Sequence, residues 1–227
     1  MQPKLCLALD TGLQKVRDLV RALKGYPLVY KIGYRLFLPF GPSVVDEIKE
    51  ISGNGEIFLD LKLHDIPNTV RNGVKEASNL GVNYLTLHTL GGIEMVKAAS
   101  EVKGDTKLLG VTLLTSHGSD YLEFIGTNLG KEEFVLRLAK AALEGGCDGL
   151  VCSAHEVEFL KRELGRDFIA VVPGIRLKKN INDDQKRVAT PEEALDRGAD
   201  MLVVGRPILN AEKPIKVVEE ILKIMGY

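Results

Sequence analysis

The sequence lacks the features that mark several classes of protein. No stretch approaches the roughly 18 uninterrupted apolar residues that indicate a membrane-spanning helix. Lysine and arginine are spread along the chain without a long basic run, and the formal net charge is −1, so a nucleic-acid-binding surface is not indicated. The opening MQPKLCLALD has no basic segment followed by an apolar segment, as a secretory signal would. We therefore expect a cytoplasmic protein with neither membrane nor nucleic-acid partners.

Cysteine is also scarce. The three cysteines are Cys6, Cys147 and Cys152, and no two of them form a C-x-x-C pair. Each lies in or just before an apolar, strand-like run. This pattern is typical of small buried thiols in a reducing compartment.

What the sequence does contain is a regular alternation of apolar strands and amphipathic helices. Its 227 residues are 45% hydrophobic and 27% charged, which suits one well-packed globular domain over residues 1–227. Eight strand-like runs recur, most of them beginning about 20 to 30 residues after the previous one, and each is followed by a helical pattern. The runs lie at 4–9, 28–32, 56–64, 82–87, 107–114, 148–152, 168–172 and 201–204.

This alternation predicts a parallel sheet whose strands are connected by helices. Eight such units in this length predict an α/β protein with a closed (β/α)8 barrel, the TIM barrel, as a single domain. An open doubly wound sheet is the structural alternative, but no G-x-G-x-x-G follows the first strand. The expected helices lie at 13–23, 42–51, 70–80, after 91–92, at 121–125, 132–144 and 154–164, from 191, and at 215–225.

The third strand carries the most informative side chains, in the stretch EIFLDLKLHDIPNT from Glu56 to Thr69. Strand alternation places Asp60, Lys62 and His64 on one face, whereas the opposite face is aliphatic. Buried charges are costly unless they are paired, and a lysine held between carboxylates stays protonated. Lys62 is therefore a candidate cationic proton donor. The structural alternatives are an internal salt-bridge network, or Asp65 acting as a helix cap ahead of Pro67.

The active site of such a barrel forms at the C-terminal ends of its strands. Polar residues recur at these ends, whereas the strand bodies are aliphatic. The candidates are Asp10, Lys31, Asp60, Lys62, His64, Asp65, His88, Thr115, Ser116, the 173–176 turn, Gly205 and Arg206.

The turns after the last two strands suggest a phosphate site, which commonly forms there in this fold. Gly174 and Gly205 allow close backbone approach, and Arg176 and Arg206 are donors suited to phosphate. Tight turns with solvated arginines are the alternative. The polar segment 177–188, which includes Gln185, is either a lid over the anion or a solvated loop.

Three histidines, His64, His88 and His117, lie at or just past the ends of consecutive strands. A divalent metal site is conceivable there. Neutral histidines with satisfied hydrogen bonds, or turn residues, are favoured because no carboxylate–histidine ligand set is spaced convincingly. We therefore predict no metal ligands.

Over essentially its whole length, the sequence resembles the orotidine 5′-phosphate decarboxylase family. The strongest match is DLKLHDIPNT at 60–69, which fits the family's specific D-x-K-x-x-D-I-P-x-T signature. Supporting matches are LD at 9–10, KIG at 31–33, LTS at 114–116, PGIR at 173–176 and VGRPI at 204–208.

The resemblance implies decarboxylation of orotidine 5′-phosphate to UMP and CO₂, the last step of de novo UMP biosynthesis, without a cofactor or a metal. By this resemblance Lys62 would protonate C6 of the pyrimidine, and Asp60 would lie against the substrate carboxylate. Lys31 and Asp10 would hold ribose hydroxyls and complete the charge network.

The resemblance also implies a homodimer with shared active sites. Asp65, Ile66 and Thr69 would reach into the neighbouring subunit's site. By the same resemblance, the phosphate would be held by Arg206, the backbone of Gly205 and Gln185. Thr115 would border the pyrimidine, and Pro173 and Arg176 would contact the closing loop.

Two other functions are compatible with parts of the pattern. Mg²⁺-dependent sugar-phosphate decarboxylases and aldolases of the same superfamily share the third-strand array but have a carboxylate in place of the second-strand lysine, so Lys31 argues against them. A non-catalytic sensor of nucleotide phosphates would not need the intact array of Asp10, Lys31, Asp60, Lys62 and Asp65.

Overall fold

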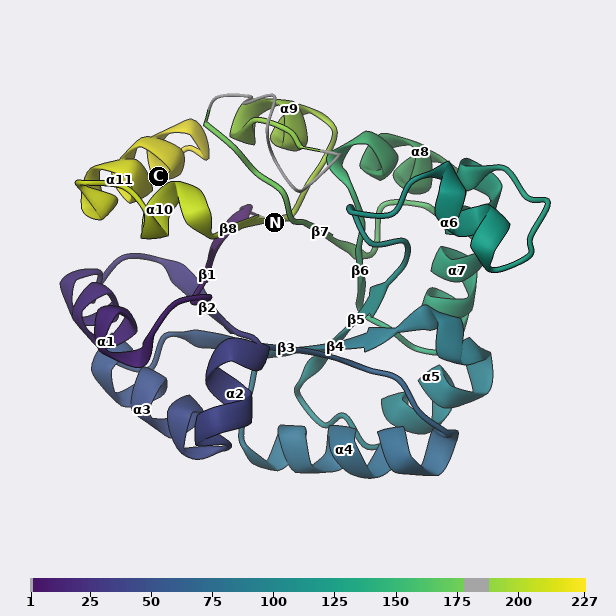
Figure 1. The fold of residues 1–227 in the computed structure, drawn as a ribbon, viewed down its shortest axis with the longest axis horizontal. Coiled ribbons are helices and arrows are strands. Elements are labelled where there is room, and N and C mark those ends of the chain that lie inside the picture. The colour runs from purple at the N-terminus through teal and green to yellow at the C-terminus, as the bar shows by residue number, and fades with distance from the viewer. Residues whose placement is uncertain (1, 178–187) are drawn as a thin grey trace.

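Eight parallel strands close into a barrel in sequence order, and β1 completes the ring by pairing with β8 (Figure 1). The structure, a computed structural model, describes residues 2–177 and 188–227, so the predicted phosphate contact Gln185 lies outside the described residues. The strands are β1 (Lys4–Ala8), β2 (Leu28–Ile32), β3 (Glu56–Leu63), β4 (Tyr84–His88), β5 (Lys107–Val111), β6 (Gly149–Val151), β7 (Ile169–Val172) and β8 (Met201–Val204). The predicted single-domain (β/α)8 barrel is confirmed.

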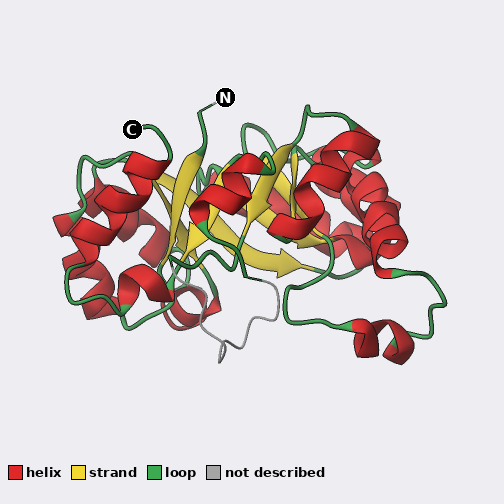
Figure 2. Cartoon of the chain, turned by 90° about the horizontal axis from the view of Figure 1, so that it is seen from above, coloured by secondary structure: helices red, strands yellow, loops and turns green. Residues whose placement is uncertain are grey.

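Helices surround this barrel on the outside (Figures 1 and 2). They are α1 (Leu13–Ala22), α2 (Tyr34–Phe40), α3 (Ser43–Ser52), α4 (Pro67–Asn79), the 3-10 turn η1 (Thr89–Gly91), α5 (Gly92–Ser100), α6 (Ser119–Phe124), α7 (Lys131–Glu144), α8 (Ala154–Leu164), α9 (Pro191–Asp196), α10 (Arg206–Leu209) and α11 (Pro214–Ile224). Within the described ranges, no helix has the length and apolar character needed to cross a membrane.

Two short helices, α2 and α10, were not predicted. Pro39 lies inside α2, and α10 has only four residues, with a proline in its first turn. Such segments are too short for a helical period to be recognised in the sequence. Helix α9 begins with a capping box, in which the Thr190 side chain accepts a hydrogen bond from the Glu193 backbone amide.

The hydrophobic core has two layers, because strand residues point alternately outward and inward. Outward residues such as Leu5, Ile57 and Leu85 pack in the large cluster that includes buried helix residues. Inward residues fill the barrel itself: Cys6, Ala8, Val29, Phe58, Tyr84, Leu109, Val171, Met201 and Val203. All three cysteines are buried and free, as expected.

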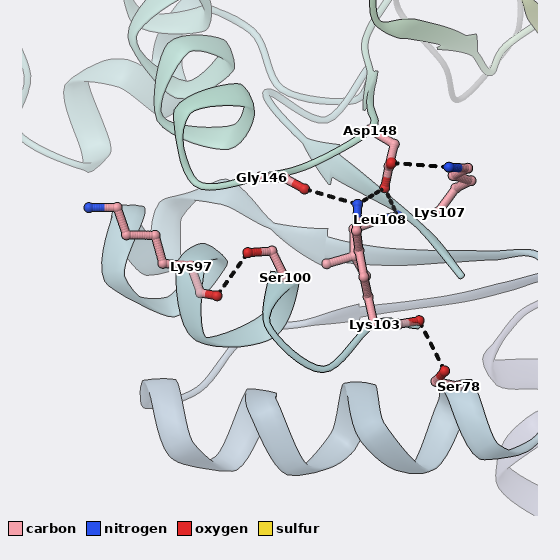
Figure 3. Close-up of polar contacts among 8 residues, drawn as sticks. All are labelled: Ser78, Lys97, Ser100, Lys103, Lys107, Leu108, Gly146 and Asp148. Atoms are coloured by element: carbon pink, nitrogen blue, oxygen red, sulfur yellow. Dashed lines mark hydrogen bonds and ion pairs between the residues drawn. The ribbon is translucent and has the colours of Figure 1, made fainter. Parts of the chain in front are cut away.

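The N-terminal end of the barrel is held by ion pairs and hydrogen bonds. Figure 3 shows Lys103 donating to the Gly146 carbonyl and to Asp148, with Lys107 pairing with the same carboxylate. The two chain ends also lie on one side of the molecule, opposite the projecting helix α6 (Figure 2), and the Tyr227 hydroxyl donates to the Pro3 carbonyl. Polar contacts at this end therefore stabilise the barrel far from the mouth where the strands end.

Candidate active site

A cavity of about 560 Å³ opens among the C-terminal ends of the strands, as the fold predicts. This volume is within the usual range for small-molecule sites. The lining includes eleven candidates from the sequence: Asp10, Lys31, Asp60, Lys62, Thr115, Ser116, Pro173, Gly174, Arg176, Gly205 and Arg206. Apolar side chains, among them Phe58, Val171 and Val203, form its floor, because they belong to the inward-facing layer of the barrel.

Asp60 is the centre of the charged array. Its Oδ1 lies 2.8 Å from the Lys62 ammonium, and its Oδ2 lies 3.1 Å from the Lys31 ammonium. Lys31 also lies 3.5 Å from Oδ2 of Asp10. Strand β2 therefore contributes one lysine, strand β3 a carboxylate and a second lysine, and the turn after β1 a second carboxylate.

Burial and pairing act in opposite directions on these groups. Burial by itself would raise the pKa of Asp60, but the ammonium groups of Lys31 and Lys62 outweigh it and lower this pKa to about 2. Burial would likewise lower the pKa of Lys31, but Asp60 and Asp10 raise it. Near neutral pH the site therefore holds a carboxylate and an ammonium that both remain charged although buried.

Gly33 gives the Asp10–Lys31 pair its space. A Cβ at this position would lie 3.2 Å from Oδ1 of Asp10 and 3.6 Å from the Lys31 ammonium. A side chain at this position would therefore crowd the Asp10 carboxylate and lie in contact with the Lys31 ammonium. The sequence motif KIG contained this glycine, but its packing against the pair depends on the turn after β1.

The third strand departs from regular strand alternation. The pairing of β3 with β4 is interrupted between Leu59 and Leu63, and Lys62 has a left-handed backbone conformation with φ of 48°. Asp60 and Lys62 both line the cavity, as alternation predicted. His64, expected on the same face, lies beyond the strand and is exposed, because the irregularity breaks the two-residue period.

Thr86 on β4 is the polar residue at this site that sequence reasoning missed. It is 1% exposed, and its hydroxyl donates to Oδ1 of Asp60 over 2.9 Å. The only signal in the sequence was a threonine within the apolar run VNYLTL, which by itself suits many strands.

The predicted phosphate turns lie together at the cavity. Gly174, with a φ of 77°, adopts a conformation that favours glycine, and it lines the cavity with Gly205. Arg176 donates from Nη1 to the Ile175 carbonyl, and Arg206 opens helix α10. The geometry places two arginines beside two close-approach glycines, an arrangement that suits a phosphate.

Asp65, Ile66 and Thr69 do not line this cavity. All three are exposed, and the Asp65 carboxylate accepts a hydrogen bond from the Ile66 amide. The Ile66 side chain is 66% exposed, which is unusual for a large aliphatic residue. In this single chain Asp65 is therefore separate from the array around Asp60.

The three histidines make ring contacts in this structure. His64 and His88 stack with ring centroids 5.7 Å apart, and His117 stacks on Tyr121. Burial and the neighbouring His64, His117 and Lys62 lower the pKa of His88 to about 4. In the part of the chain that the structure describes, no group of three or more His, Cys, Asp or Glu side chains is arranged to hold a metal ion.

Comparison with known proteins finds relatives over nearly the full length of the chain. The model of the orotidine 5′-phosphate decarboxylase / HUMPS family matches residues 3–221. Orotidine 5′-phosphate decarboxylase of Aquifex aeolicus is 50% identical over 98% of both chains, and that of Carboxydothermus hydrogenoformans is 44% identical over 93% of this chain and 91% of its own. The crystal structure of orotidine 5′-phosphate decarboxylase from Lactobacillus acidophilus has a TM-score of 0.87 at 37% identity, covering 99% of this chain and 100% of that one.

Proposed function

Because this chain belongs to the orotidine 5′-phosphate decarboxylase / HUMPS family, we propose that it is a carboxy-lyase that converts orotidine 5′-phosphate to UMP and CO₂, the last step of de novo UMP biosynthesis. The observation that carries this proposal is the array of Lys31, Asp60 and Lys62 at the mouth of the barrel. The match to the family model and the relatives confirm the resemblance found in the sequence at the level of the family.

The chemistry of the reaction explains why such an array is needed. Loss of CO₂ from C6 leaves an electron pair in the plane of the pyrimidine ring, where the π-system cannot delocalise it. In the proposed cofactor-free reaction the protein stabilises this charge electrostatically. A fixed ammonium beside C6 does so and then delivers the proton, and we assign this role to Lys62.

The other charged residues hold that ammonium and the substrate. Asp60 would lie against the departing carboxylate while pairing with Lys62 on the other side. Lys31 and Asp10 would hold ribose hydroxyls, and their 3.5 Å contact supports a shared position at the sugar. The low pKa of Asp60 supports a charged carboxylate throughout the physiological range.

The remaining cavity residues suit the two ends of a nucleotide. Arg206 and the backbone of Gly205 would hold the phosphate, together with Gln185, while Thr115 would border the pyrimidine. Pro173 and Arg176 would contact the segment that closes over the substrate. Binding energy from a phosphate remote from C6 can drive closure and exclusion of water from the reacting end.

We also propose that the active unit is a homodimer in which Asp65, Ile66 and Thr69 complete the partner's site. Their exposure outside their own cavity supports this assignment. Exposed apolar side chains on α2 and η1, among them Leu38 and Leu90, would also be covered in such a dimer. The cytosol stays the predicted location of the enzyme.

Ultraviolet absorbance tests the proposed reaction directly, because orotidine 5′-phosphate and UMP differ in spectrum. Purified protein should change the spectrum of orotidine 5′-phosphate to that of UMP at the same rate with and without EDTA. A rate that EDTA abolishes would favour the Mg²⁺-dependent relatives. Binding of the nucleotide without any spectral change would favour a sensor.

A further inference from the structure

We propose that the Leu61–Lys62 peptide unit is held by two side-chain hydroxyls, those of Thr86 and Tyr34, and that these two are positioning residues for Lys62. The inference rests on the proposed function, because it concerns how the proton donor is aimed. It assigns a role in catalysis to two residues that do not themselves touch the reacting atoms.

We call the Thr86 and Tyr34 hydroxyls that hold this peptide unit the clamp. The need for the clamp arises in the backbone. The ladder between β3 and β4 is interrupted between Leu59 and Leu63, so the peptide groups in between lose their regular strand partners. Lys62 also has a φ of 48°, which is uncommon for a residue with a long side chain. Such a conformation persists only where surrounding contacts over-determine it.

Two hydroxyls replace the lost ladder at this peptide unit. The Lys62 amide donates to Oγ1 of Thr86 over 2.9 Å, and the Leu61 carbonyl accepts from the Tyr34 hydroxyl over 2.7 Å. These two groups belong to the same peptide bond, so the plane of that bond is held from both sides. Thr86 approaches from β4 inside the barrel, and Tyr34 approaches from the start of α2 outside it.

Thr86 also connects the backbone clamp to the charged array. Its hydroxyl accepts from Lys62 and donates to Oδ1 of Asp60, the same oxygen that the Lys62 ammonium contacts. A hydroxyl has a single proton to donate, so accepting from the amide directs that proton toward the carboxylate. One buried side chain thus sets both the backbone from which Lys62 projects and the carboxylate against which its ammonium rests.

The tertiary structure makes this a specific role rather than general packing. A valine would fill the space of Thr86 but would leave the Lys62 amide without its acceptor and Asp60 without one donor. A small displacement of a catalytic group is enough to slow chemistry by about 100-fold. Binding of the remote phosphate would not depend on this clamp, so the turnover number should suffer more than the Michaelis constant.

The test compares Thr86→Val with Thr86→Ser and with Thr106→Val as a matched control. Thr106 is also a buried threonine, and its hydroxyl donates to the Val82 carbonyl at the opposite end of the barrel. We expect kcat for orotidine 5′-phosphate to fall about 100-fold in Thr86→Val with a much smaller change in KM. Thr86→Ser and Thr106→Val should stay within about threefold of wild type, since each keeps the clamp hydroxyl. An unchanged kcat in Thr86→Val, or an equal loss in Thr86→Ser, would overturn the proposal.

Two further measurements distinguish failure of the clamp from failure of the proposed function. Hydrogen exchange of the Lys62 amide, followed by NMR, should become faster in Thr86→Val and stay unchanged in Thr106→Val. Unchanged exchange in Thr86→Val would contradict the proposed clamp, even if the wild-type protein showed no decarboxylation. A wild-type protein that leaves orotidine 5′-phosphate unchanged would instead refute the proposed function. If Thr86→Val does not fold, Tyr34→Phe takes its place, because it removes the hydroxyl of a half-exposed side chain that donates to the Leu61 carbonyl. An unchanged kcat in Tyr34→Phe would contradict the proposal.

Discussion

The Lys62 ammonium lies 2.8 Å from Oδ1 of Asp60, a residue only two positions earlier on the same strand. Lys31, from the neighbouring strand, lies 3.1 Å from the other oxygen of that carboxylate. One carboxylate therefore holds two ammonium groups, and only Lys62 projects from the irregular part of β3.

Removing the proposed proton donor should abolish the reaction and preserve the fold. Lys62→Ala is expected to lower the rate of conversion to UMP by at least about 10⁴-fold, since it removes both the proton donor and the cation at C6. Absorbance gives the rate, and circular dichroism gives the fold. The control is Lys107→Ala, which removes a lysine that pairs with Asp148 at the other end of the barrel (Figure 3). Near-normal turnover in Lys62→Ala would contradict the assignment.

Subunit mixing should reveal shared active sites. Lys62→Ala and Asp65→Ala are each expected to be inactive as homodimers. After random exchange, half of the dimers would be mixed, each with one intact site, so about a quarter of wild-type activity should return. Two Lys62→Ala preparations mixed in the same way serve as the control. If the exchanged mixture stays inactive, Asp65 does not act across the interface.

Substitution of Arg206 should weaken binding of the nucleotide through its phosphate. We expect Arg206→Ala to raise the dissociation constant for UMP about 10- to 100-fold, because a charge-assisted contact with the phosphate is lost. Arg162→Ala is the control, since Arg162 is an exposed arginine on α8 that pairs with Glu163. Titration calorimetry with UMP and with uridine gives the measurement. If the variant loses affinity for uridine as much as for UMP, Arg206 is not the phosphate contact.

The low pKa of Asp60 predicts a dependence of stability on pH. In the folded chain this pKa is about 2, against 3.8 for an ordinary aspartate, so the unfolded state binds a proton first as the pH falls. The stabilisation is complete above about pH 4 and is lost as the pH falls through about 2, with a total of about 2 kcal/mol. Urea unfolding of wild type and Asp60→Asn should therefore show a stability difference that changes below pH 4. A difference that is constant with pH would refute the pairing.

The low pKa of His88 predicts a second dependence of stability on pH, at milder pH. Its pKa of about 4 in the folded chain, against 6.5 normally, keeps it neutral where an unfolded histidine takes up a proton. The folded protein should therefore lose stability as the pH falls from about 6.5 toward 4. His88→Asn can still accept a hydrogen bond from the Leu90 amide, as Nδ1 of His88 does, but it does not titrate. A pH dependence as steep in this variant as in wild type would show that other groups cause it.

Most of the fold was predictable from the sequence, because its periodicity is strong and local. The strands Leu28–Ile32 and Met201–Val204 and the helix Ala154–Leu164 match their expected ranges. Elsewhere the type of element was correct, but the ends shifted; the fifth strand, for example, ends at Val111 and not at 114. The two missed helices are short and contain proline, so no period could identify them.

The sequence by itself determined the barrel, the identity of its charged residues and their place at the strand ends, because alternation and helical spacing are properties of neighbouring residues. Only the tertiary structure decided how those charges are held. The left-handed backbone of Lys62, the Thr86 hydroxyl beneath it and the space that Gly33 leaves for Asp10 and Lys31 depend on contacts between different strands. Hydrogen bonds between segments far apart in the chain have no period in the sequence, so they become visible only when the barrel closes.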